Sequence, residues 1–447
     1  MKIQLSDHFN YRKLLKFTFP SVAMMIFTSI YGVVDGFFIS NFVGITEFAS
    51  INLILPFIIM VGCFGFMFGA GGSALVSKTF GKNENDKANR IFSMLIYVGI
   101  GTGVLISILG IAFIEPIAVL LGADESMLDF CVVYGRIVLL ALPAFMLQNM
   151  FQSFLITAEK PTLGLFVTLA AGCTNMLLDA LFIAVLKLGV VGAASATALA
   201  QCVGGIIPFI YFARKNTSLL KLGRFKLDAR ALLTSCLNGS SELVTNISLS
   251  VVSILYNFQL MKFAGENGVA AYGAVMYVCF IFVAVFIGYS IGVAPVIGFH
   301  YGAENSDELK NLFKKSNVLI CACSLILSAI AFFLATPLAK FFLGADTVEN
   351  KPELIEMTVT AFRYFAFAVL FCGFSIFGSS FFTALNNGVV SATISFLRTL
   401  LFQVLAVLIL PIFFEIDGVW YSLFVSELLA LFVTFAFFVA MRKKYKY

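Results

Sequence analysis

Long apolar segments recur along the whole chain, separated by short polar loops, and they constrain the fold more than any other feature. Several reach roughly 18 residues or more, enough for an α-helix to cross the hydrocarbon core of a bilayer. The composition agrees: 12% of the residues are charged, whereas a soluble domain carries about 25%. Predominantly apolar runs such as 317–339 do not alternate as transmembrane β-strands do. The sequence therefore predicts an all-α polytopic membrane protein.

Polar breaks divide the chain into twelve expected transmembrane helices. Their approximate limits are 14–40, 50–78, 91–114, 128–157, 162–186, 190–213, 234–261, 269–299, 316–339, 357–384, 390–414 and 418–441.

Lysine and arginine are concentrated in alternate loops. They gather in the segments 2–16, 78–90, 214–230, 310–315 and 442–446, with Lys160 on the same side, whereas the loops that alternate with these hold only Lys187, Lys262, Lys340 and Lys351. Because cytoplasmic loops carry the excess of Lys and Arg, both termini are expected in the cytoplasm. We expect a multi-pass protein of the cell (plasma) membrane, in contact with membrane lipid. The net charge of +5 reflects this orientation and does not indicate nucleic-acid binding.

An internal repeat organises the chain. SKTFGKNENDKANRIF, residues 77–92, resembles GFHYGAENSDELKNLF, which begins 221 positions later. The expected domains are an N-lobe with six helices (1–213), a cytoplasmic linker (214–233) and a C-lobe with six helices (234–447). Since six is even, both lobes keep the same orientation, as in transporters whose halves are related by a pseudo-twofold axis along the membrane normal. A central cavity between the lobes would open alternately to each side.

Few ionisable residues fall deep inside the expected spans. The chain has 24 Asp and Glu residues, and only Asp35, Asp179, Glu242 and Glu427 lie well within them. A charged group at the bilayer centre costs roughly 2.5–3.5 kcal/mol on insertion scales. Each of these acids therefore needs a partner, a proton or a function. For Glu427 the sequence offers no obvious partner, and a buried interhelical hydrogen bond is the default expectation.

Four polar residues of the first half form a candidate proton or cation site. Asn175 and Asp179 are four residues apart and so lie one turn apart on one helix face. With Asp35 and the hydroxyl of Thr197 they supply hard oxygen ligands, suited to Na⁺ or to a shared proton. Two carboxylates in one dry pocket cannot both stay ionised without a cation between them. The alternatives are a structural acid at Asp35 and helix–helix hydrogen bonding by Asn175 and Thr197.

Three stretches carry a family resemblance: SIYGVVDGFFISNFVG (29–44), NMLLDALF (175–182) and GAASATALAQ (192–201). Together with the twofold repeat of six helices they resemble the multidrug and toxic compound extrusion (MATE) transporters, across essentially the whole chain. The resemblance implies export of bulky, often cationic organic drugs in exchange for H⁺ or Na⁺. It also implies that Asp35, Asn175, Asp179 and Thr197 bind that H⁺, or the metal ion if Na⁺ is used. Part of the family carries an Asp in the tenth span, which here has no deep acid, so we expect coupling through the first lobe.

Further polar and aromatic residues are tentative substrate-binding positions. They are Thr28, Tyr31, Gln148, Asn149, Gln152, Glu242, Tyr256, Tyr277 and Arg398. Several have an alternative interpretation. The three amides could simply pack helices, Glu242 could be an acid near a helix start, and Arg398 could extend to the cytoplasmic interface.

Other functional classes fit less well. A lipid-linked saccharide flippase, the alternative within the wider superfamily, needs several cations to hold a pyrophosphate group, and the spans supply essentially Arg398. An integral membrane enzyme is not favoured because the chain has only His8 and His300 and no pairing of a nucleophile with a base. We therefore expect a secondary active transporter that acts as a monomer and needs no cofactor beyond its coupling ion.

Overall fold

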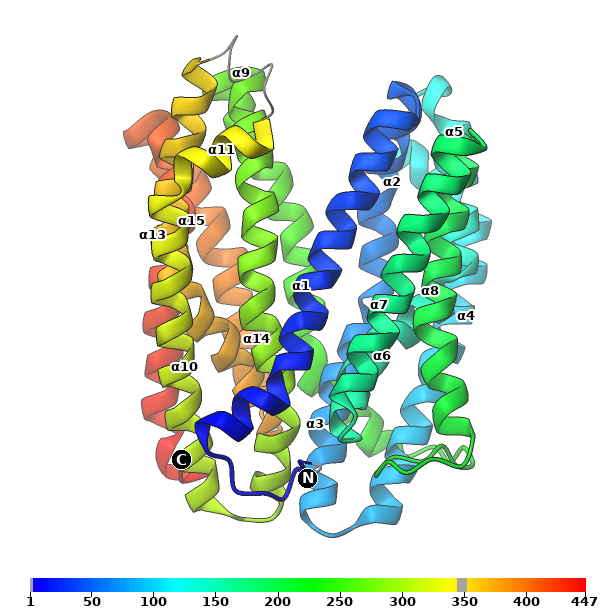
Figure 1. Ribbon diagram of the computed structural model, residues 1–447, viewed down its shortest axis with the longest axis vertical. Helices are drawn as coiled ribbons and strands as arrows, with labels where there is room; N and C mark the ends of the chain where they lie inside the picture. Colours follow the sequence, from blue (N-terminus) through cyan, green and yellow to red (C-terminus); the bar gives the residue numbers. More distant parts are fainter. Residues whose placement is uncertain (1–2, 344–351) are drawn as a thin grey trace.

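Both ends of the described chain lie at one end of the helical assembly, which we call the termini end (Figure 1). The computed structural model describes residues 3–343 and 352–447. Their helices stand side by side in two groups (Figure 1). The elements are α1 (Tyr11–Phe42), α2 (Ile45–Gly62), α3 (Phe64–Gly81), α4 (Asn85–Leu120), α5 (Glu125–Leu140), α6 (Leu142–Thr157), α7 (Pro161–Asp179), η1 (Ala180–Val185), α8 (Gly189–Ala213), α9 (Ala229–Gly302), α10 (Ser306–Phe333), α11 (Ala335–Leu343), α13 (Pro352–Ala384), α14 (Gly388–Phe396), η2 (Leu397–Leu401) and α15 (Phe402–Tyr445).

The helices of the described chain account for the expected spans. Nine segments are long and apolar enough to cross a membrane, and the pair α5 and α6, bent by 53°, raises the number to ten. Two of the nine are long enough for two spans each: α9, with 74 residues, and the segment Gly388–Tyr445, with 58. Each contains one residue with non-helical backbone, Gly265 (φ 58°) and Glu415 (φ 50°). Dividing the segments there gives twelve spans, which confirms the predicted fold class.

The repeat seen in the sequence is also present in the backbone. Equivalent turns of the two halves each contain a residue other than glycine with a left-handed φ between 50° and 61°. Because few residues other than glycine adopt this conformation, the coincidence is informative. The fifth span of each half also contains a π-helical segment: η1 ends that span in the first half, whereas η2 lies within it in the second half, between α14 and α15. The paired turn residues are Asn83 with Glu304, Glu159 with Asn386, and Lys187 with Glu415.

The two halves meet closely where α3 crosses the last turns of α9, a contact that we call the seam. A Cβ atom added to Gly81 would lie 2.0 Å from the carbonyl oxygen of Phe299. A Cβ atom added to Gly302 would lie 2.0 Å from the carbonyl oxygen of Lys78. Gly302 and Phe299 are the repeat partners of Gly81 and Lys78, 221 positions later. Each half thus offers the same surface to the other, as the subunits of a twofold-symmetric dimer do.

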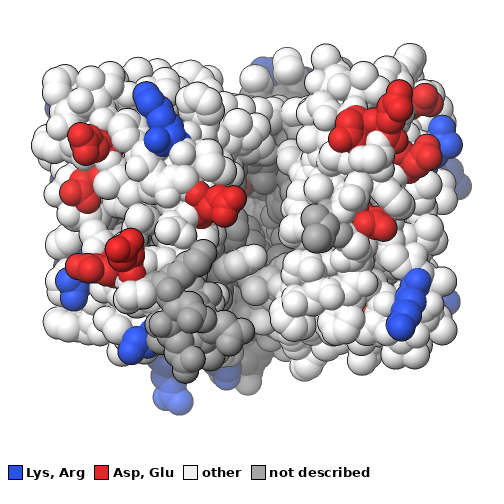
Figure 2. Space-filling view, turned by 90° about the horizontal axis from the view of Figure 1, so that it is seen from above, with Lys and Arg blue, Asp and Glu red and all other residues white. Residues whose placement is uncertain are grey.

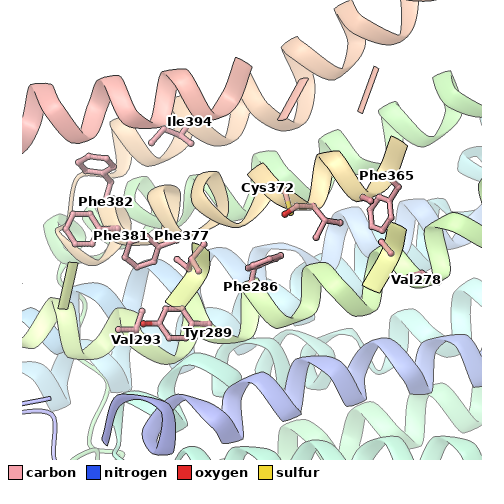
Figure 3. Close-up of a cluster of buried hydrophobic side chains, with 14 of the residues drawn as sticks. Val278, Phe286, Tyr289, Val293, Phe365, Cys372, Phe377, Phe381, Phe382 and Ile394 are labelled. Carbon is pink, nitrogen blue, oxygen red and sulfur yellow. The ribbon is translucent and has the colours of Figure 1, made fainter. Parts of the chain in front are cut away.

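Each half has a hydrophobic core of its own. One buried cluster draws on helices of the first half and includes Phe92, Phe151 and Phe154. The other draws mainly on α9, α13, α14 and α15, and Figure 3 shows part of it, including Phe286 and Phe377. This second core also takes in residues from the N-terminal segment and the first turns of α1. Two separate cores allow the halves to move against each other, although the lobe limits at 213 and 234 stay a prediction.

The surface is hollowed between the halves at the end opposite the termini (Figure 2). In this view Asp and Glu side chains cover more of the rim than Lys and Arg do (Figure 2). The seam lies at the other end of the molecule, where α3 and α9 reach the termini end (Figure 1). The described conformation is therefore open on one side and closed on the other.

Candidate functional site

The candidate cation site lies between α1 and α7. The Asp35 carboxylate interacts with the side chains of Asp179 and Asn175. Gly172 lets the two helices approach, because a Cβ atom there would lie 2.5 Å from the ring of Phe27. Asn175 and Asp179 are 3% and 0% exposed, and Asp35 is half-buried. The structure therefore brings together the two acids and the amide that the sequence suggested.

Most side-chain oxygen atoms of this site lack a hydrogen-bond partner in the described part of the chain. Asp35 Oδ1, both carboxylate oxygens of Asp179, Asn175 Oδ1 and Thr197 Oγ1 have no hydrogen-bond partner among the described residues. A carboxylate oxygen only accepts hydrogen bonds, so two carboxylates cannot bond to each other unless one of them carries a proton. Buried polar atoms are normally paired. This cluster of facing acceptors can be satisfied by a proton on one acid or by a cation between them.

Two residues that the sequence reasoning did not assign complete the surroundings. Tyr134 of α5 is 1% exposed, and its hydroxyl lies near Thr197 without a hydrogen bond of ordinary geometry between them. Gln201 lies one turn after Thr197 on α8, and its Oε1 atom also lacks a partner among the described residues. The spacing of Thr197 and Gln201 was a usable signal, because residues four apart share a helix face. Tyr134 lies in an apolar run without any pattern that points to a site.

A change in helix type follows the site directly. Asp179 is the last residue of α7, and the chain continues as the π-helical segment η1. π-Helical turns are rare and are frequent at functional sites, since they widen the helix and shift side chains around it. Here the wider turn begins directly after the buried acid.

The amide cluster of α6 is packed rather than open. Gln148, Asn149 and Gln152 are all less than 9% exposed. Gly204 of α8 lies against Gln148, and a Cβ atom at Gly204 would be 2.6 Å from its Cδ. The cavity beside Gln148 and Gln152 has a volume of about 10 Å³, the space of about one water molecule. In this conformation the cluster has no room for a drug.

The tentative substrate residues do not form one cluster. Tyr31 contacts Gln148, whereas the Thr28 hydroxyl donates to the Met24 carbonyl of its own helix, 2.9 Å away. Tyr256 is buried in the second half, with its hydroxyl 2.8 Å from Ser422 Oγ. Tyr277 is 42% exposed and lines a groove of about 430 Å³ on α9. Their role in binding substrate stays a prediction.

Glu242 lies near the contact between the halves. It follows Gly239 by three residues and therefore shares its face of α9. A Cβ atom at Gly239 would lie 1.9 Å from the Met67 carbonyl of α3, so this face points at the first half. The side chain of Glu242 is half-buried. Its position fits a residue whose surroundings change when the halves move.

Arg398 and Glu427 form a buried ion pair in the second half. Arg398 Nε lies 3.0 and 2.9 Å from the two carboxylate oxygens of Glu427, and Nη2 lies 2.9 Å from Oε1. The side chains are 13% and 3% exposed. The alternative interpretation, that Arg398 extends to the cytoplasmic interface, is wrong, because a carboxylate on α15 holds the guanidinium inside. A role of Arg398 in binding substrate stays a prediction. The partner of Glu427, which the sequence did not reveal, is this arginine.

The two halves differ in the charged groups that lie beside their π-helical segments. Asp179 immediately precedes η1, and Arg398 lies within η2. The first half holds unpaired acids there, whereas the second half holds a neutralised pair. No group of three or more His, Cys, Asp or Glu side chains suited to a metal ion occurs in the part of the chain that the structure describes.

Comparisons with known proteins identify relatives along the full length. The "Multidrug export protein MepA" of Staphylococcus haemolyticus is 23% identical over 435 residues, covering 97% of this chain and 94% of the relative. The protein of the same name from Staphylococcus saprophyticus is 26% identical over 366 residues, covering 81% of this chain and 80% of its own.

Solved structures agree on the fold. One described as a crystal structure of MATE in complex with MaL6 superposes with a TM-score of 0.93 at 20% identity, covering 98% of both chains. Another, described as the outward-facing conformation of a multidrug resistance MATE family transporter, gives 0.91 at 21% identity, covering 98% of this chain and 97% of the other. The MatE family model matches residues 20–181 and 243–408, one segment in each half. The chain therefore belongs to the MatE family, and it is a secondary transporter rather than an enzyme.

Proposed function

We propose that this transporter exports bulky, often cationic organic compounds and is driven by H⁺ or Na⁺ that binds in the first half. The observation that carries the proposal is the group of facing, unpaired oxygens of Asp35, Asn175, Asp179 and Thr197. The names of the relatives, multidrug export proteins, support the substrate class.

The cycle follows from two-state coupling. In the described conformation the recess faces the end opposite the termini, which we propose is the outside of the cell membrane (Figure 2). A cation or proton entering there satisfies the acids, and the drug leaves. The neutralised site then favours the conformation that is open to the cytoplasm, where the ion departs and the next drug binds. Such coupling requires that each ligand bind the two conformations with different affinity.

The proposed moving bodies are the lobes 1–213 and 234–447, joined by the linker 214–233. Both termini are then cytoplasmic, in agreement with the basic loops at that end and the acidic rim at the other (Figure 2). One chain holds both halves of the path, so a monomer suffices. A saccharide flippase is disfavoured because Arg398, the cation available for a pyrophosphate, is already paired with Glu427.

The test is ethidium transport into inside-out vesicles, with an imposed pH gradient or Na⁺ gradient in turn. One gradient should drive the wild type and thereby name the ion, and Asp35→Asn should fold normally and lose the driven transport. Glu115→Gln is the matched control, because it removes an exposed acid of α4 away from the site. Wild-type rates in Asp35→Asn under both gradients would refute the proposed site.

A further inference from the structure

The chain segment before α1 is held tightly by the second half. We call residues 3–10 the N-terminal strap. The Phe9 N–H donates to Glu308 Oε1 at 2.9 Å, and His8 Nδ1 lies 2.5 Å from Glu308 Oε2. The Phe9 carbonyl accepts from Asn311 Nδ2 at 2.9 Å and from Lys315 Nζ at 2.7 Å. Phe9 is 0% exposed. The strap is therefore an ordered part of the structure at the start of α10.

The same strap is also bonded to the first half. The Leu5 N–H donates to Glu159 Oε1 at 2.9 Å, and Leu5 is 1% exposed. Glu159 lies in the turn between α6 and α7, where its backbone has a left-handed φ of 56°. One carboxylate from each half thus accepts a backbone N–H from the same short segment. The four residue-to-residue steps from Leu5 to Phe9 can span at most about 14 Å when fully extended.

The equivalent turn of the second half reaches across in the same way. Asn386 is the repeat partner of Glu159, and its φ is 57°. Its Nδ2 donates to the Ala74 carbonyl of α3 in the first half, 3.2 Å away. Its Oδ1 accepts from Asn238 of α9 at 2.8 Å. Both turns therefore tie the halves together on the side where the seam is closed.

We propose that the N-terminal strap is a latch that keeps the termini end closed, and that Glu159 and Glu308 are its gating residues. The proposal rests on the alternating access of the proposed function and adds the residues that hold one of its two states. Separation of the halves at this end pulls Glu159 away from Glu308, so opening requires that the strap leave at least one of them. Hydrogen bonds to a charged acceptor are the stronger kind. Loss of one should change the ratio of closed to open molecules by about tenfold.

The experiment measures the distance between the halves by pulsed electron spin resonance. Spin labels are placed at Asp86→Cys and Lys314→Cys, two exposed positions at the termini end, one in each half. The nine native cysteines are replaced by alanine, and the resulting background must retain ethidium efflux. The variants are Glu159→Ala, Glu308→Ala and the full protein without the segment before Asn10. Glu84→Ala is the matched control, since this exposed acid of the same end pairs with Lys87 and does not contact the strap.

The expected result is a population of longer distances that grows about tenfold in either single variant and further in the double variant. Strap removal should reproduce the double variant, and it tests the same point with Glu159 and Glu308 both in place if Glu308→Ala fails to fold. Unchanged distance distributions in both the double variant and the strap removal, equal to those of Glu84→Ala, would overturn the latch.

The readout requires neither drug nor gradient. It therefore stays informative even if Asp35→Asn transports normally and the proposed ion site fails. If the latch variants open while Asp35→Asn transports normally, the latch is supported and the proposed ion site is refuted.

Discussion

At the scale of single residues, the charged groups deep in the spans include the acids of the first half and the Arg398–Glu427 pair of the second half. Asp35 and Asp179 could be assigned from the sequence, because an acid deep in an apolar span is costly and therefore needs a function. Asn175 could be assigned because it lies four residues before Asp179, on the same helix face. Tyr134 could not, because a tyrosine in an apolar run is more often core. The pairing of Arg398 with Glu427 could not be predicted either, because the two residues lie on different elements and only packing brings them together.

Asp179→Asn should abolish the coupling while keeping the fold. The new amide can donate a hydrogen bond to Asp35, which imitates the protonated pair permanently. Gradient-driven efflux should fall by about tenfold or more, the size of a typical coupling free energy. Thr174→Val alters a half-buried position of the same helix, whose hydroxyl bonds only to the carbonyl of Ala170, as a control. Normal gradient-driven efflux in Asp179→Asn, measured in vesicles, would mean that the acid is structural.

The Arg398–Glu427 pair should matter when it is broken and little when it is replaced. Glu427→Gln alone leaves a buried guanidinium uncompensated, so we expect a loss of about 3–5 kcal/mol in stability. The double variant Arg398→Met with Glu427→Leu should recover most of that loss. Thermal unfolding of the purified protein measures both. Equal destabilisation by the single and the double variant would show that the charges themselves are required.

At the scale of whole elements, the seam between α3 and α9 leaves no room for an added side-chain atom. Gly81→Ala and Gly302→Ala each place a Cβ atom 2.0 Å from a backbone carbonyl, which cannot move aside as a flexible side chain can. The variants should force the termini end apart and favour the conformation open there. Gly101→Ala in α4 is the control, because a Cβ atom at that position meets nothing within 4 Å.

The same pair of spin labels at Asp86→Cys and Lys314→Cys measures this effect. Longer distances in both seam variants, with no change in Gly101→Ala, are expected. Unaltered distances in Gly81→Ala and Gly302→Ala would mean that α3 and α9 can rearrange locally and that the seam does not set the closed state.

Helices themselves were well predicted, because long apolar runs leave the backbone no other way to satisfy its hydrogen bonds in a membrane. Their interruptions were not. The second span breaks at Cys63 and the fourth at Ala141, inside runs that read as continuous. In the fourth span Pro143 lies at the start of α6, where proline is well tolerated, so the sequence fits a new helix start as well as a kink.

At the scale of the whole molecule, the repeat predicts the two-half architecture and the loop charges predict the orientation in the membrane. The resemblance of 77–92 to 298–313 predicted two related halves, and paired left-handed turns and the seam agree with it. The sequence could not predict which side is closed in a given state. That depends on contacts between distant segments, such as Leu5 with Glu159.

The orientation in the membrane can be tested directly. In a background without native cysteines, Ser126→Cys lies at the acidic end and Lys226→Cys in the basic linker. A membrane-impermeant thiol reagent should label the first in intact cells and the second only after permeabilisation. The opposite pattern would invert the proposed topology and place the termini outside.

The seam also has a consequence for how such a chain can be assembled. Its two faces are repeat partners, so each half carries a surface that is complementary to its own equivalent. A polypeptide that consisted of only one half would carry a surface able to pair with a second copy of itself, through the glycine that corresponds to Gly81 or Gly302. Joining two such halves in one chain would preserve that pairing while freeing one copy to change.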